Sequence, residues 1–260
     1  MNYQNLNKVI AYIEKHLDCE IDYKEISRIV GFSEYSFQRI FLFLTDFSLT
    51  EYIRKRRLSR AVEELKNSNT KIIDIALKYN YSSSISFSRA FKQYFGVTPS
   101  ECRKNNREYK IFPVIKFDNK KDLYDEVNYE IKEIDTIDLY YYSVEAERHD
   151  DLLYKIRNLY RNFDDKIPKS DRYGIYMVDN NRYKYFLCMK NKENNMKKIT
   201  IEGGKYAVFN TLSRDQDNIV KMYKFIYNEW IASTNYKVRD DLLNFEYYYD
   251  DNCYIYVPIR

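Results

Sequence analysis

Apolar residues in the first hundred positions recur at helical spacing, and one such pattern occurs twice. The segment 26–32 reads ISRIVGF and recurs at 75–81 as IALKYNY. The segment 36–41 reads SFQRIF and recurs at 86–91 as SFSRAF. Each copy predicts a short helix, a tight turn and a second helix, which is the arrangement of a helix-turn-helix unit.

The turn and the second helix of each unit carry residues suited to these roles. Gly31 and Asn80 stand where the chain needs a positive φ, which glycine adopts freely and asparagine tolerates. Two phenylalanines four residues apart predict the core-facing side of each second helix, namely Phe37 with Phe41 and Phe87 with Phe91. Arg39 and Arg89 then point elsewhere, which leaves a surface for DNA.

The stretch between the two copies predicts one long helix that holds them at a fixed distance. Residues 48–51 (SLTE) have the form of a capping box. Burial is predicted for Ile53, Ala61, Val62 and Leu65, and the other side is basic through Arg54, Lys55, Arg56, Arg57 and Arg60. An isolated basic run usually forms a solvated face, but between two helix-turn-helix units it also predicts contacts with DNA phosphates.

Two recognition helices on one chain could enter successive major grooves, roughly 34 Å apart, without a dimer. In this respect the chain resembles the AraC/XylS family of transcription regulators, whose DNA-binding domain has the same double arrangement. The resemblance covers residues 6–106 and is carried by the runs 31–33 (GFS), 37–41 (FQRIF), 52–53 (YI), 57–58 (RL), 75–76 (IA), 87–92 (FSRAFK) and 96–100 (GVTPS).

The resemblance implies base contacts from both recognition helices, by Tyr35, Ser36, Gln38 and Arg39 in the first and by Ser84, Ile85, Ser86 and Arg89 in the second. The chemistry agrees, because arginine pairs with guanine, glutamine pairs with adenine, and isoleucine packs on a thymine methyl group. Asn80, Ser27 and Cys102 depart from the family's usual glycine, alanine and aromatic residue. The second recognition helix is rich in serine, which suggests that this helix mainly contacts phosphates.

Beyond residue 125 the hydrophobic spacing changes to short alternating runs. It predicts strands at 127–134 and 139–145, a helix at 150–162, and strands at 173–178 and 183–189, the last two joined by a turn at 179–181. The order then recurs as a strand at 206–212, a helix at 215–232, and strands at 243–249 and 254–259 around a turn at 250–252. Such duplicated units commonly pair about a pseudo-two-fold axis and leave a ligand cleft between them.

The two halves together predict a multidomain chain. Its all-α double helix-turn-helix domain spans residues 1–108, a linker spans 109–125, and an α+β domain of duplicated strand-helix-strand-strand units spans 126–260.

The second half also resembles a known family, the GyrI-like effector-binding domains, which follow an AraC-type module in Rob-like regulators. The runs 203–209 (GGKYAVF), 227–230 (YNEW), 245–248 (FEYY) and 255–259 (IYVPI) carry this resemblance. It is strong over residues 198–260 and only architectural over residues 125–190.

The resemblance implies a cleft that binds bulky aromatic cations, because aromatic faces attract a cation and a buried carboxylate neutralises it. Glu246 is the expected carboxylate and Trp230 the expected stacking wall. The remaining expected lining residues are Tyr206, Phe209, Tyr142, Glu145, Tyr176 and Tyr248. Each single tyrosine, however, could equally fill a strand-rich core.

Charge and composition agree with this organisation. Residues 1–110 hold 19 Lys and Arg against 13 Asp and Glu, whereas residues 111–260 hold 24 against 26, so the first half is the basic one. The four cysteines and two histidines lack paired spacing, which predicts neither a disulfide framework nor a metal site, and no cofactor is expected. Without a long apolar run or a signal peptide, we expect a cytoplasmic protein that does not contact a membrane.

The expected partners are double-stranded promoter DNA and a hydrophobic or cationic small molecule, and RNA polymerase is a further partner that such a function allows. Two alternatives concern the C-terminal half. It could be a hydrolase of a small reactive compound, with Glu246 as a general base, although the sequence offers no Ser-His-Asp or Cys-His arrangement. It could also bind a protein partner and no ligand, in which case its own side chains would close the cleft.

Overall fold

The contacts within the computed structural model divide the chain into two compact units. The structure describes residues 3–117, 127, 129–147, 149–163, 171–179, 182–193 and 195–260. One unit, here the sheet unit, comprises Met1–Asn2, Gly31–Ser48 and Asn119–Arg260, and the other, the helical unit, comprises Tyr3–Val30 and Leu49–Asp118. The predicted domain bounds at 108 and 125 stay predictions, and residues 118–126 lie outside the described part of the chain.

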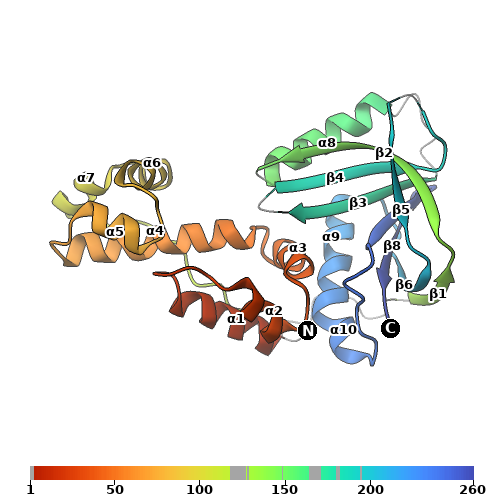
Figure 1. Cartoon of the computed structure of the whole chain (residues 1–260), viewed down its shortest axis with the longest axis horizontal. Helices are drawn as coiled ribbons and strands as arrows, with labels where there is room; N and C mark the ends of the chain where they lie inside the picture. The colour runs from red at the N-terminus through yellow and green to blue at the C-terminus, as the bar shows by residue number, and fades with distance from the viewer. Residues whose placement is uncertain are drawn as a thin grey trace. The chain divides into compact units, whose positions relative to one another are not determined.

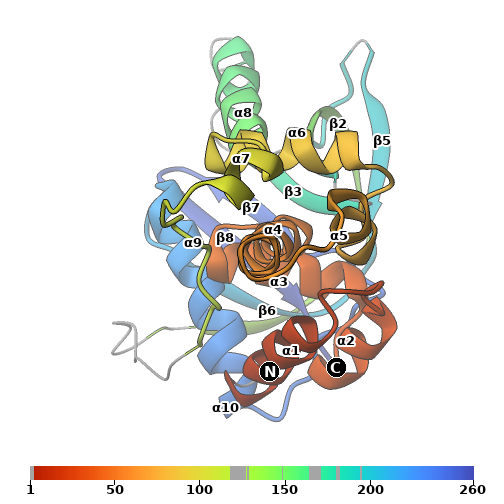
Figure 2. The same cartoon turned by 90° about the vertical axis from the view of Figure 1, so that its left-hand side faces the viewer.

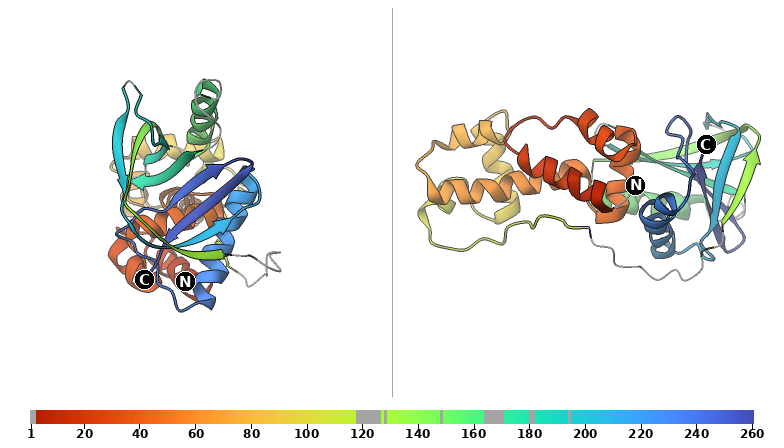
Figure 3. Two further views of the ribbon diagram at one scale, coloured as in Figure 1. Left: turned by 90° about the vertical axis from the view of Figure 1, so that its right-hand side faces the viewer. Right: turned by 90° about the horizontal axis from the view of Figure 1, so that it is seen from below.

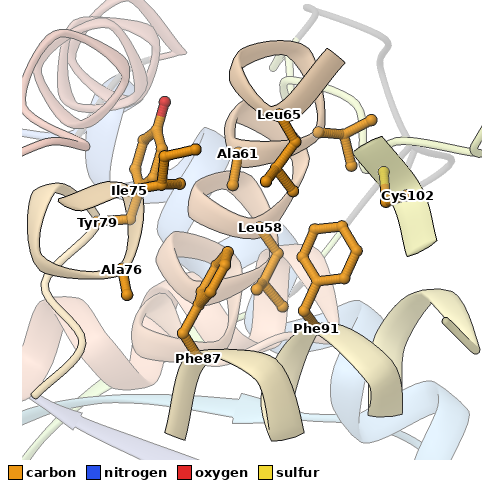
Figure 4. Close-up of a cluster of buried hydrophobic side chains, with 10 residues drawn as sticks. Leu58, Ala61, Leu65, Ile75, Ala76, Tyr79, Phe87, Phe91 and Cys102 are labelled. Carbon is orange, nitrogen blue, oxygen red and sulfur yellow. The ribbon is translucent and has the colours of Figure 1, made fainter. Parts of the chain in front are cut away.

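The helical unit is built around one long helix, as the spacing between the two copies predicts. Its elements are α1 (Tyr3–Lys15), α2 (Tyr23–Val30), α4 (Leu49–Asn67), α5 (Ile72–Lys78), α6 (Ser84–Phe95) and α7 (Pro99–Lys104). The helices α5, α6 and α7 gather around one end of α4 (Figures 1 and 2). Their shared core consists of Leu58, Ala61, Val62, Leu65, Ile75, Ala76, Tyr79, Phe87, Phe91 and Cys102 (Figure 4).

The turns of the helix-turn-helix units have the backbone that the sequence predicts. Gly31 has φ 74° and Asn80 has φ 63°, so both lie in the left-handed region. In the second unit Ser83 caps α6 by accepting a hydrogen bond from the Ser86 amide, and Gly96 ends the helix at φ 77°. Caps and turn residues therefore fix where α6 begins and ends.

The sheet unit contains an eight-stranded antiparallel sheet that is strongly curved (Figure 3). Its strands are β1 (Tyr129–Ile134), β2 (Ile137–Ala146), β3 (Arg172–Asp179), β4 (Arg182–Met189), β5 (Lys197–Ile201), β6 (Gly204–Asn210), β7 (Phe245–Tyr249) and β8 (Asn252–Pro258). Its helices are α3 (Glu34–Thr45), α8 (His149–Phe163), α9 (Gln216–Phe225) and α10 (Ile231–Ser233), with a π-helical segment, η1 (Ile226–Trp230), between the last two.

The strand order confirms the predicted duplication. The sheet runs β1-β6-β8-β7-β3-β4-β2-β5. The unit β2-α8-β3-β4 therefore gives the triplet β3-β4-β2, and the unit β6-α9-β7-β8 gives the equivalent triplet β7-β8-β6. The two triplets meet where β3 pairs with β7, which is the position of a pseudo-two-fold axis.

The two faces of the sheet differ because side chains alternate along a strand. One face carries a hydrophobic core that includes Leu139, Tyr173, Ile175, Cys188, Tyr206, Val208 and Phe245. The other face is covered by helices, since α8 packs on β2 and β4 and Tyr223 of α9 reaches Glu246 of β7. Glu246 therefore lies on the helix-covered face.

The structure differs from the predicted elements at three places. The strand β5 was not predicted, because its five residues begin with two lysines and show little alternation. The strand predicted at 206–212 ends at Asn210, since Leu212 takes a φ of 55°. The helix predicted at 215–232 is interrupted by the π-helical segment. The last two residues of the turn predicted at 179–181 lie outside the described part of the chain.

Candidate effector site and recognition helices

The candidate effector site is centred on Glu246 in β7. Its neighbours Phe245 and Tyr247 point to the core face of the sheet, so Glu246 and Tyr248 share the helix-covered face. Tyr248 donates its hydroxyl to Glu246 Oε2 at 2.6 Å, and Tyr223 of α9 donates to Oε1 at 3.2 Å. The side chain is buried, with 7% of its surface exposed. Both carboxylate oxygens are thus held by phenol groups.

Burial sets the protonation of this cluster. It raises the pKa of the Glu246 carboxyl, whereas the hydrogen bonds from Tyr248 and Tyr223 and the charge of Arg39 oppose that rise. Burial also raises the pKa of the hydroxyls of Tyr160, Tyr185, Tyr223 and Tyr248. The four tyrosines therefore stay protonated at neutral pH, and Glu246 is the member of this cluster that can carry negative charge.

Gly174 of β3 provides space for this arrangement. It lies opposite Glu246 in the β3–β7 register. A Cβ atom at this position would lie 2.3 Å from Tyr185 Oη and 2.8 Å from Glu246 Oε2. Tyr185 in turn hydrogen bonds Tyr160 of α8 at 2.8 Å between hydroxyl oxygens. Each half of the duplicated fold thus brings a helix-borne tyrosine toward one acid.

The helix α3 packs within the sheet unit against α9 and β3. The Phe43 ring stacks on the Tyr223 ring, with 4.4 Å between centroids and 8° between planes. The same ring lies 5.7 Å from the Tyr176 ring. Phe43 therefore contacts the tyrosine whose hydroxyl holds Glu246.

Polar contacts fix α3 in the same place. The Arg39 side chain is 4% exposed and donates from Nη2 to Tyr227 Oη at 2.8 Å. Asp240 accepts a hydrogen bond from Ser36 Oγ at 2.5 Å and another from the Ser33 amide at 2.9 Å. The first of the two predicted recognition helices is thus held by the residues around the candidate effector site.

The structure brings together part of the predicted effector-binding set. Glu246 and Tyr248 are hydrogen bonded to each other. Tyr176 contacts Phe43, which stacks on the Tyr223 ring beside Glu246. Trp230 packs instead against Phe209, with 5.0 Å between ring centroids, in a separate aromatic group that includes Tyr129 and Tyr236.

Three other predicted lining residues lie apart from Glu246. Tyr206 packs on Phe245 and belongs to the core on the opposite face of the sheet. Tyr142 stacks on Phe163 of α8 and donates to Glu193. Glu145 is exposed and pairs with Arg182 and Lys184, because it lies toward the end of β2.

Sequence reasoning included Tyr248 but missed Tyr223 and Gly174, which also position Glu246. Tyr223 and Tyr227 lie four residues apart in the predicted helix 215–232, and this spacing could have indicated a shared aromatic face. Gly174 inside a predicted strand could have indicated a close approach. The π-helical turn that contains Tyr227 has no comparable signal in the sequence.

The residues predicted to contact DNA have different surroundings in the two recognition helices. In α6, Ile85 is 73% exposed and Arg89 is exposed, while Ser86 is bonded to the capping residue Ser83 and Ser84 is half-buried. In α3, Gln38 bonds Glu34, and both Ser36 and Arg39 are buried in the contacts given above. The side chain of Tyr35 lies outside the described part.

Part of the basic side of α4 makes contacts within the helical unit, and phosphate binding by this run stays a prediction. Arg56 binds both oxygens of Glu14, with Nε to Oε1 at 2.7 Å and Nη2 to Oε2 at 2.8 Å. Arg57 donates to the carbonyls of Leu17 and Cys19, and Lys55 pairs with Glu51. Arg54 and Arg60 are the members of the run that are exposed.

The two repeats and the buried acid define a DNA-binding regulator with an effector-binding domain, and comparison with known proteins agrees. A helix-turn-helix domain model matches residues 26–105, and a model of the integron-associated effector binding protein matches residues 130–259. The chain therefore belongs to the AraC/XylS family of transcription regulators, with a GyrI-like effector-binding domain in its C-terminal half.

Two curated proteins and one solved structure are similar to parts of this chain. HTH-type transcriptional activator AarP of Providencia stuartii is 36% identical over 104 residues, or 40% of this chain and 77% of that protein. Regulatory protein SoxS of Escherichia coli K12 is 36% identical over 104 residues, or 40% of this chain and 97% of that protein. A solved integron cassette protein of Vibrio cholerae aligns over 51% of this chain and 95% of its own, with 20% identity and a TM-score of 0.41.

The described residues offer neither a membrane-spanning helix nor a metal-binding cluster. In the part of the chain that the structure describes, no helix is long and apolar enough to cross a membrane. Among the same residues, no group of three or more His, Cys, Asp or Glu side chains could hold a metal ion.

Proposed function

We propose that the C-terminal domain of this transcription regulator binds a hydrophobic organic cation at Glu246 and thereby controls DNA binding. The observation that carries the proposal is a single buried carboxylate among protonated tyrosines, with both of its oxygens held by phenol hydroxyls. The effector-binding family of this domain and the DNA-binding family of the other half supply the remaining support.

The chemistry of the site favours a bulky cation over an anion or a polar metabolite. A carboxylate in an apolar environment attracts a positive charge strongly, since little water screens it. The faces of aromatic rings add cation–π attraction without demanding one ligand shape. A large delocalised cation also loses less hydration on burial than a compact ammonium ion.

We propose binding without turnover. Each oxygen of Glu246 accepts a hydrogen bond from a phenol hydroxyl, and these bonds lower the pKa of the carboxyl, which makes it a weaker base toward water. The described relatives are transcription regulators, which agrees with sensing as the task of this domain.

For DNA we propose that Arg89 and Ile85 of α6 and Gln38 of α3 contact bases, with Ser84, Ser86 and Tyr35 beside them. Ile85 is a large apolar side chain that is exposed at the start of a recognition helix, where it could meet a thymine methyl group. Ser36 and Arg39 belong to the same predicted set, but they are bonded to Asp240 and Tyr227.

The proposal is tested by isothermal titration calorimetry of the full chain with tetraphenylphosphonium. We expect saturable binding that Glu246→Gln weakens at least tenfold, because the neutral amide keeps the shape and removes the charge. Glu145→Gln is the matched control, since it removes an exposed carboxylate of the same domain. Neutral triphenylphosphine oxide should bind no better to the wild type than to Glu246→Gln. Equal affinity of wild type and Glu246→Gln for the cation would contradict the proposal.

A further inference from the structure

We propose that the first recognition helix, α3, is itself the resting occupant of the effector site, and that a cationic effector competes with it. This inference rests on the proposed function, because it takes Glu246 as the cation-binding carboxylate. Effector binding would then release α3, and with it two of the residues predicted to contact bases.

The first observation is that α3 presents the chemistry of a hydrophobic cation to the site. Arg39 and Phe43 are four residues apart, so they lie on one face of the helix. One supplies a planar positive charge and the other an aromatic ring. This pair matches the combination of groups that the site is proposed to recognise in a small molecule.

The second observation is where this pair lies. Phe43 stacks on Tyr223, which donates a hydrogen bond to Glu246, and it also contacts Tyr176. A ligand whose aromatic ring stacked on this face of Tyr223 would need the place of the Phe43 ring. The two rings are nearly parallel, as they are in a stacked ligand complex.

The third observation is electrostatic. Arg39 is buried and donates to Tyr227, which also accepts a hydrogen bond from Asn244 at 2.5 Å. The positive charge of Arg39 lowers the pKa of Glu246, Tyr223 and Tyr227 against the effect of burial. Arg39 therefore stabilises the negative charge of Glu246, which is the role that we assign to the effector.

The fourth observation concerns the start of α3. Asp240 accepts hydrogen bonds from the Ser33 amide and the Ser36 hydroxyl, at the end of the helix where negative charge is favourable. Ser36 and Arg39 cannot bind DNA bases while they are bonded to Asp240 and Tyr227. The docked state of α3 and a state with these residues in a major groove therefore exclude each other.

These contacts define two states of one element. In the resting state α3 is held by Phe43, Arg39 and Asp240, and in the other the cation occupies the site and α3 is released. A ligand shifts such an equilibrium only by binding one state better than the other, and direct competition for Tyr223 provides that difference.

The test compares tetraphenylphosphonium binding to the full-length wild type and to Phe43→Ala by calorimetry. Removing the internal ring should increase the affinity for the cation about tenfold or more, because the cation no longer displaces it. Phe95→Ala is the matched control, since it removes a half-buried phenylalanine from α6 in the helical unit. Arg39→Gln is a second variant with the same expected direction.

A second measurement uses the wild type alone, in case the variants fold poorly. Amide hydrogen exchange across residues 34–45 should become faster at saturating tetraphenylphosphonium and should not change in Glu246→Gln. Absence of cation binding in every variant would contradict the proposed function itself. Wild-type binding with unchanged or weaker affinity in Phe43→Ala and Arg39→Gln, and unchanged exchange in α3, would overturn only this inference.

Discussion

At the scale of single residues, the candidate site depends on Gly174, which has no Cβ atom. Gly174 leaves the space in which Tyr185 Oη and Glu246 Oε2 approach the β3 backbone. Its φ does not require glycine, so the reason for a glycine here is contact and not backbone conformation. Glu246 and Tyr185 therefore pack directly against the backbone of β3 at Gly174.

We expect Gly174→Ala to lower the free energy of unfolding by about 1–3 kcal/mol, because the added methyl group would overlap two oxygen atoms. Urea unfolding followed by circular dichroism measures this change. Tyr185→Phe removes the nearer oxygen, so the double variant should lose less than the sum of the two single losses. Strict additivity would show that Tyr185 does not limit this space.

The pH dependence of stability follows from the raised pKa of Glu246. Between the ordinary value of 4.5 and the folded pKa, the native state holds a proton that the unfolded state releases. The stability that this proton provides is present below pH 4.5 and is lost as the pH rises through the folded pKa.

Glu246→Gln should therefore gain stability relative to the wild type as the pH rises above 4.5, and the difference should level off above the folded pKa. Urea unfolding from about pH 4 to about pH 8 checks this. Tyr248→Phe removes a hydrogen bond that lowers the pKa of Glu246, so it should extend the pH-dependent range upward. A stability difference between Glu246→Gln and the wild type that is independent of pH would contradict this account.

At the scale of elements, turn residues and the alternation of apolar and polar residues predicted helix and strand positions best. Gly31 and Asn80 marked the two helix-turn-helix turns because few residues adopt a positive φ. The alternating runs placed β3, β4, β7 and β8 to within two residues. The strand β5 was not predicted, because it is short and begins with two lysines. The π-helical segment was not predicted either, because it depends on tertiary packing.

The turn at Gly31 gives a prediction of its own. Gly31→Ala should lower the free energy of unfolding by about 1 kcal/mol, because an L-residue at φ 74° is strained. No atom lies within 4 Å of the added Cβ, so the cost is conformational and not steric. Thermal unfolding measures it. Gly31→Asn is the control and should lose clearly less, as the natural Asn80 turn indicates; an equal loss would point to a cause other than φ.

At the scale of the whole molecule, the sequence predicted the class of protein, but it predicted only some residues of the candidate effector site. The duplicated runs revealed both the DNA-binding half and the effector-binding half. Glu246 was predicted from its run, but Tyr223 and Gly174 were not, since their role comes from the β3–β7 register and from α9. Ser36 and Arg39 of α3 were expected on an open surface, because spacing within a helix does not reveal what covers it.

Competition for the effector site predicts a reciprocal linkage between ligand and DNA. Saturating tetraphenylphosphonium should tighten binding of a duplex selected from random sequence by about 5–150-fold, and that duplex should tighten cation binding by the same factor. Fluorescence anisotropy of labelled DNA and calorimetry give the two factors. In Glu246→Gln both should fall to about one, and a cation that weakened DNA binding would contradict the direction of the coupling.

The hairpin registers also show which residues of the two repeats stand at equivalent positions. Asp179 pairs with Arg182 in the first repeat, and Tyr249 pairs with Asn252 in the second, so equivalent positions differ by 70 (249 − 179 and 252 − 182). The position equivalent to Glu246 is then Tyr176. Two carboxylates at these equivalent positions would lie about one axis and repel each other. Because the second repeat holds an acid and the first a tyrosine, this pair of positions carries one negative charge and not two, so charge balance there needs one positive charge.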